Sequence, residues 1–151
     1  MPNWCSNRFE LQARSDVIDH FIEQYCPDGA FRFSSVIPAE KTAEAQTMAW
    51  GTKWDLDSDE GVPEVDTVEI NGEPSDLKRL TLEFSTAWSP PLYVMDQIWN
   101  DFDNRFVSDE DFNDAIDRMK LVYIEEGNDV GGVWENGAIM DDIEEARREL
   151  D

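Results

Sequence analysis

The residue types that most often carry catalysis are scarce in this chain. There is one histidine, His20, and it falls on the polar face of a predicted amphipathic helix, so we expect it to be exposed. A hydrolase triad or a histidine-based acid–base pair needs a positioned partner, which the sequence does not offer. The sequence also has no glycine-rich phosphate loop and no HExxH motif. We therefore predict a protein that is not an enzyme and has no cofactor.

The two cysteines, Cys5 and Cys26, give no metal or redox motif. The sequence has no CxxC and no cluster of His and Cys, which argues against a structural zinc site. Its start lacks a basic segment followed by an apolar run, and no apolar run approaches the length of a membrane helix. We expect a cytoplasmic protein with both thiols reduced and buried.

Charge is the strongest signal. The 151 residues include 35 Asp and Glu against 12 Lys and Arg, a net charge of -23. Such a chain is a poor binder of nucleic acid or anionic membrane, because both need cations on the protein. Leu, Ile, Val and Phe make up 35 of the 151 residues, above the roughly 20% typical of disordered chains. The chain is expected to fold as one domain with a negative surface.

One acidic segment spans residues 55–69, with seven acids and no base. Its opening spacing resembles a calcium loop, but Glu60 and Asp66 stand where an EF-hand needs Gly and Glu. A solvated acidic loop is the better interpretation, and it serves as a secondary acidic site made of Asp55, Asp57, Asp59 and Glu60.

Two further acidic segments lie near the C-terminus. Residues 96–117 hold eight acids against Arg105, and residues 141–151 hold six acids against Arg147 and Arg148. We predict that these segments form a partner-binding acidic surface. Its residues are Asp101, Asp103, Asp109, Glu110, Asp111, Asp114, Asp117, Asp141, Asp142, Glu144 and Glu145.

Three explanations of the acidity remain open. Carboxylates along rigid helices can imitate the field of DNA, which carries about one charge per 1.7 Å of axis. A host living in molar salt would favour an acidic chain poor in Lys, and four Lys against eight Arg fits that pattern. The third explanation is solubility alone.

Hydrophobic periodicity predicts the elements. Alternation indicates strands at 4–11, 30–33, 65–70, 80–85 and 121–124, and a last short strand within 127–137. Helical spacing indicates helices capped by Ser15 and by Ser89, a short helix from Ser108, and a terminal helix at 141–150. This order predicts an α+β fold of ferredoxin-like type, an antiparallel sheet with helices packed on one face plus a C-terminal helix.

Three tryptophan-rich stretches resemble a known family. They are residues 1–7 (MPNWCSN), 50–55 (WGTKWD) and 84–91 (FSTAWSPP). Together they resemble the Api92/YubB-like ferredoxin-like domain family of phages, conjugative plasmids and genomic islands. The resemblance covers 1–137, a domain with a long loop at 38–64 and an acidic insertion at 103–118. Residues 138–151 add a C-terminal acidic helix. The resemblance implies a ferredoxin-like fold and a mobile-element origin, but no catalytic or binding residues.

The motif residues are expected to meet as one cluster, made of Asn3, Trp4, Trp50, Lys53, Trp54, Asp55, Thr86, Trp88 and Ser89. Trp and Lys beside polar groups can hold a ligand by stacking and cation–π contact. The same residues can instead lock the long loop onto the sheet.

We therefore expect a non-enzymatic acidic interaction protein of a mobile element in a bacterial cytoplasm. Its partner would be a basic host protein, such as a nucleic-acid-binding defence component, which a DNA-like or RNA-like surface inhibits. The alternative is a small-ligand or partner-binding module at Trp50, Trp54 and Trp88, with acidity serving only solubility or salt adaptation.

Overall fold

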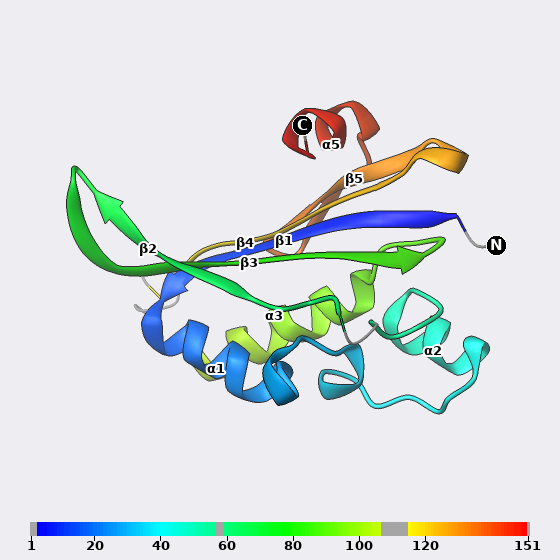
Figure 1. Ribbon diagram of the computed structural model, residues 1–151, viewed down its shortest axis with the longest axis horizontal. Helices are drawn as coiled ribbons and strands as arrows, with labels where there is room; N and C mark the ends of the chain where they lie inside the picture. Colours follow the sequence, from blue (N-terminus) through cyan, green and yellow to red (C-terminus); the bar gives the residue numbers. More distant parts are fainter. Residues whose placement is uncertain (1–2, 57–58, 107–114, 151) are drawn as a thin grey trace.

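The computed structural model describes residues 3–56, 59–106 and 115–150 (Figure 1). Its strands form one antiparallel sheet in the order β2-β3-β1-β4-β5-β6. The predicted α+β class and C-terminal helix are confirmed. In chain order the elements are β1 (Trp4–Arg14), α1 (Ser15–Tyr25), α2 (Ala43–Trp50), β2 (Glu64–Ile70), β3 (Glu73–Ala87), α3 (Leu92–Phe106), β4 (Ile116–Glu125), β5 (Val130–Glu135), β6 (Ala138–Met140) and α5 (Ile143–Leu150).

The main core lies between the sheet and the helices α1 and α3. Alternate residues of β1 are buried on this face, Phe9 and Leu11 among them. In α1 the spacing predicted from the sequence holds, because Val17, Ile18 and Phe21 are buried. Figure 1 shows α1, α2 and α3 on one side of the sheet.

The predicted N-caps are wrong at both long helices. Arg14 occupies the N-cap position of α1, without a side-chain cap, and the Ser15 hydroxyl points to the Asp76 carbonyl oxygen instead (3.5 Å). Helix α3 begins at Leu92 rather than after Ser89, whose hydroxyl donates to the Gly51 carbonyl (2.6 Å). In both cases the serine hydroxyl makes a tertiary hydrogen bond and does not cap the helix.

The predicted strand at 30–33 is also wrong. The segment is irregular and runs into a 3₁₀ turn at Phe33–Ser35. Its amides bond outside any ladder, Phe31 N to the Gly61 carbonyl (2.8 Å) and Arg32 N to the Tyr25 carbonyl (3.1 Å). Phe31 and Phe33 are fully buried, so their alternation reflects insertion into the core and not strand pairing.

The long loop at 38–64 contains α2, and the helix predicted from Ser108 lies mostly outside the described residues, which stop at 106 and resume at 115. The strand predicted within 127–137 is β5, and it pairs with β6, which occupies the start of the segment predicted as the C-terminal helix at 138–151. That helix begins only at Ile143.

Helix α5 packs on the face of the sheet opposite α1 and α3 (Figure 1). Ala146 is fully buried against Val122 and Val133, with Leu150 at the margin. Most of its sheet contacts are with β4 and β5, and Arg8 of β1 donates to the carbonyl of Glu149. The remainder of this face, over β1 and β3, is left without a helix among the described elements, and we call it the open face.

Candidate functional site

Most cations on the open face form ion pairs within the chain, whereas Arg8 donates to the backbone carbonyl of Glu149. The Glu10 carboxylate pairs with Arg79 (3.0 Å) and Arg118 (3.1 Å). Lys120 forms an ion pair with Glu149 of α5. This face therefore carries ordered charges of both signs rather than a basic field.

The acids predicted at the C-terminus serve local roles. The Asp142 carboxylate accepts hydrogen bonds from the amides of Glu144 (3.1 Å) and Glu145 (3.2 Å), which caps α5. Asp141 accepts from the Tyr123 hydroxyl (3.1 Å). Glu144 and Glu145 pair with Arg147 and Arg148, so α5 carries three glutamates against two arginines. This helix is only weakly negative.

Of the acids predicted between 101 and 117, the structure describes Asp101, Asp103 and Asp117. Asp117 accepts a hydrogen bond from Gln12 Nε2 (2.7 Å), while Asp103 is exposed. Asp109, Glu110, Asp111 and Asp114, like Asp57 of the secondary site, lie outside the described residues.

Asp101 joins helices α1 and α3. Its Oδ2 accepts from the Tyr25 hydroxyl (2.6 Å) and lies 2.9 Å from His20 Nε2, while Arg105 approaches Oδ1 (3.5 Å). The expectation of an exposed His20 is wrong, because its side chain is only 13% exposed. Burial raises the pKa of Asp101, but the hydrogen bonds from Tyr25 and His20 outweigh it, and the pKa lies below its ordinary value.

Both cysteines are free and buried, as predicted. Burial raises the pKa of each thiol to about 12, so the nucleophilic thiolate is essentially absent at neutral pH. Neither thiol is placed to act as a nucleophile.

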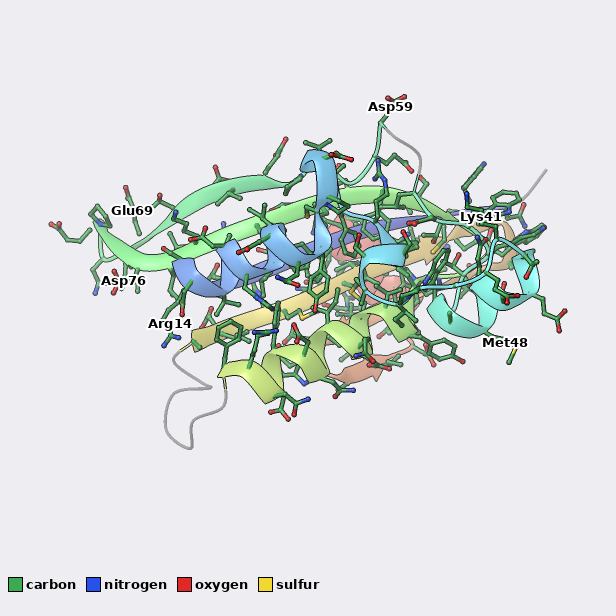
Figure 2. All side chains as sticks on the ribbon, turned by 90° about the horizontal axis from the view of Figure 1, so that it is seen from below. Arg14, Lys41, Met48, Asp59, Glu69 and Asp76 are labelled. Atoms are coloured by element: carbon green, nitrogen blue, oxygen red, sulfur yellow. The ribbon has the colours of Figure 1, made fainter. Side chains whose placement is uncertain are left out.

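Among the described residues, a group of seven carboxylates that form no ion pair follows the loop before β2 and the hairpin of β2 with β3. We call it the acidic edge: Asp59, Glu60, Glu64, Asp66, Glu69, Glu73 and Asp76. Arg79 stands opposite Asp66 in the register, but its ion pair is with Glu10. In Figure 2 the Asp59 and Glu69 side chains point away from the ribbon along the same side of the molecule.

Most of the motif residues lock the chain together. Trp50 is buried and its Nε1 donates to the Ile37 carbonyl (2.7 Å). Asp55 accepts hydrogen bonds from the amides of Phe33 (2.7 Å) and Ser34 (3.2 Å). Thr86 accepts from Asn7 Nδ2 (3.0 Å), and Asn3 accepts from the Trp88 amide (2.8 Å). These contacts fasten the long loop and the turn after β3 to the sheet.

Two tryptophans remain exposed and paired. Trp4 is 49% and Trp54 is 41% exposed, and their ring centroids are 6.2 Å apart. The Lys53 ammonium lies 4.9 Å from the centroid of the Trp54 ring. Trp88 is exposed as well, but it does not line a small cavity that lies beside Trp4 and Trp54.

A small cavity of about 100 Å³ lies beside the tryptophan pair, and it adjoins a groove of about 520 Å³. Glu60 and Ser85 line both. The groove crosses the open face to Leu150 of α5, and its other lining residues include Ser6, Arg8, Glu83 and Glu126. Sequence reasoning missed this groove, although the alternation of Trp4, Ser6 and Arg8 along β1 could have placed them on one face.

No group of three His, Cys, Asp or Glu side chains in the described ranges is arranged to hold a metal ion. No described helix is long and apolar enough to cross a membrane.

Comparison of the chain with protein-family models, with curated protein sequences and with solved structures found no match.

Proposed function

We propose that this chain is a non-enzymatic acidic interaction protein that inhibits a basic, nucleic-acid-handling protein of its host. The observation that supports this proposal is the acidic edge, seven carboxylates on a projecting hairpin and the loop before it. Carboxylates that no neighbouring cation neutralises project their field into solvent and steer a basic partner.

The acidic edge is a different surface from the one that the sequence predicts at 101–117 and 141–145. The acids of α5 and Asp101 are engaged by Arg, Tyr, His or backbone groups of the same chain. Within the acidic edge, Glu60 alone has a carboxylate that accepts a hydrogen bond from a described residue. Its Oε1 accepts from the Ser85 amide (3.1 Å). Among the described residues, the carboxylates along β2 are therefore the ones most available to a partner.

We further propose a ferredoxin-like scaffold from a mobile element that acts in a bacterial cytoplasm. The order β2-β3-β1-β4, with α1 after β1 and α3 after β3, supports this interpretation. Strands β5 and β6 and helix α5 then extend the scaffold beyond β4. The motifs at 1–7, 50–55 and 84–91 support membership of the Api92/YubB-like family.

The test compares two variants of equal charge. The edge variant carries Glu64→Gln, Asp66→Asn, Glu69→Gln and Glu73→Gln, and the control carries Asp19→Asn, Glu23→Gln, Asp103→Asn and Glu135→Gln. All eight residues are exposed. Immobilised proteins are incubated with bacterial lysate and washed, and duplex DNA is used to elute the bound basic proteins.

We expect the wild type and the control to release basic proteins into the DNA eluate, and the edge variant to release about ten-fold less. Equal recovery by the edge variant and the control would exclude the acidic edge as the binding surface. Bound proteins that duplex DNA does not displace would exclude nucleic-acid mimicry.

The alternative function, a ligand or partner module, finds support only at part of its predicted site. Trp50 is core and Trp88 stands apart from the cavity, whereas Trp54 pairs with Trp4 at its rim. This pair adjoins Glu60 of the acidic edge.

A further inference from the structure

The tryptophan pair lies where the acidic edge meets the open face. Glu60 belongs to the edge and lines the cavity beside Trp4 and Trp54. Two large rings in contact and nearly half exposed combine an apolar face with a polar indole edge, which suits recognition. The pair is therefore well placed to anchor whatever the acidic edge attracts.

The surroundings of the pair favour a cation. The Lys53 ammonium already lies 4.9 Å from the Trp54 ring centroid, so the ring accepts a cation from this chain. Asp55, Glu60 and Glu83 line the cavity and the adjoining groove, against Arg8 in the groove and Lys53 at the Trp54 ring. A cationic group is complementary both to these carboxylates and to the net charge of -23.

One carboxylate oxygen remains available in the cavity. Asp55 uses both oxygens, which accept hydrogen bonds from the amides of Phe33, Ser34 and Leu56. Glu60 Oε1 accepts from the Ser85 amide, while Oε2 has no hydrogen bond to a described residue. Glu60 is half-buried, which fixes its position at the end of the groove.

These features suit a guanidinium better than an ammonium. A planar guanidinium stacks on an indole face and at the same time donates in its plane to a carboxylate. An ammonium is a compact and strongly hydrated charge that gains less from the flat ring. We propose that Trp4, Trp54 and Glu60 form an anchor site for an arginine side chain of the basic partner. The groove of about 520 Å³ would hold the residues flanking that arginine. This inference rests on the proposed function.

The test uses two fluorescent peptides of equal charge, nona-arginine and nona-lysine, and measures their affinities at low salt. Coulomb attraction to the edge treats the two peptides alike, and any bidentate preference of the edge carboxylates for arginine does not depend on the two tryptophans. The preference given by the anchor site does depend on them. We expect the wild type to prefer nona-arginine by about two- to five-fold, the size of an exposed cation–π contact. Trp4→Leu, Trp54→Leu and Glu60→Gln should each reduce this preference while retaining most of the affinity for nona-lysine.

Tyr93→Leu is the matched control, because Tyr93 is an exposed aromatic on α3 that does not line the cavity. It should retain the arginine preference in full. A wild type without a preference, or a preference that survives both Trp substitutions, would overturn the anchor site and leave the acidic edge intact. If neither peptide binds, the proposed function fails as well. Because both tryptophans are exposed, their variants are expected to fold, and circular dichroism checks this.

Discussion

Asp101 is an acid predicted for the binding surface that instead connects two helices of the fold. The sequence places it among the acids of a binding surface, but the structure places it between α1 and α3 with Tyr25, His20 and Arg105. Hydrogen bonds to a charged acceptor are about twice as strong as those between neutral groups. Asp101 therefore ties two helices together where a solvated acid would only add repulsion.

The lowered pKa of Asp101 predicts an acid-sensitive contribution to stability. A carboxyl group whose pKa is lower in the folded state stabilises the fold at pH values above its ordinary value of 3.8. That contribution is lost as the pH falls through the folded pKa. Asp101→Asn should therefore lower the free energy of unfolding near neutral pH, by about 1–2 kcal/mol for its part-buried hydrogen bonds. The deficit should shrink below pH 3.8.

Urea unfolding from about pH 6 to about pH 3 measures this difference. The control is Asp103→Asn, two positions along the same helix and exposed, which should change stability by less than about 0.5 kcal/mol. A deficit of Asp101→Asn that stays constant over the whole range would contradict the assignment.

At the scale of elements, α5 is the most separable part of the described fold. It covers β4 and β5 on the face away from the main core, and its own cluster consists of Val122, Val133 and Ala146 with Leu150. Elements with few buried apolar contacts open at a lower free energy than the core. The groove loses one wall when α5 leaves, because Leu150 lines it.

Ala146→Asp should release this helix without unfolding the sheet. The substitution places an unpaired carboxylate in a fully buried site, at a cost of about 2 kcal/mol or more. Hydrogen exchange should then show lost protection at 143–150 and retained protection in β1 and β3. Arg148→Ala, at an exposed position of the same helix, should leave the exchange pattern unchanged. Loss of protection throughout the sheet in Ala146→Asp would show that α5 belongs to the main cooperative unit.

For the molecule as a whole, the charge is distributed unevenly. The carboxylates of α5 are paired or capped, most cations of the open face are in ion pairs, and the acidic edge forms no ion pair with a described residue. Exposed apolar residues of β2, such as Val65 and Ile70, stand among these acids on an edge strand. Charges at such an edge discourage pairing with a second copy of the same chain.

Unbalanced repulsion predicts that salt stabilises this protein. Raising the salt from about 0.05 M to about 1 M shortens the Debye length to about 3 Å, which screens the exposed acids. The Tm should rise for the wild type and rise less for the edge variant, which carries four fewer negative charges. Thermal unfolding followed by circular dichroism provides the measurement. Equal gains in Tm for the two proteins would show that the acidic edge is not a main source of repulsion, and unfolding of the wild type in low salt would favour adaptation to a saline host.

The sequence by itself determined the class of the fold and the sign of the surface. Apolar spacing in α1 and α3 and alternation in β1 and β3 are local signals, which is why these elements were predictable. The strand predicted at 30–33 failed because Phe31 and Phe33 are buried by distant residues, and alternation alone cannot distinguish that from a ladder.

Only the tertiary structure decided which charges and aromatic rings remain available. Glu149 is neutralised by Lys120 and Asp101 is bound by His20, partners far away in the sequence. Trp50 is buried while Trp54 stays exposed beside Trp4, although Trp50 and Trp54 come from the same motif. Net charge is a sum over the chain, but an unneutralised carboxylate depends on distances of a few ångströms, and those are set by strand register and helix packing.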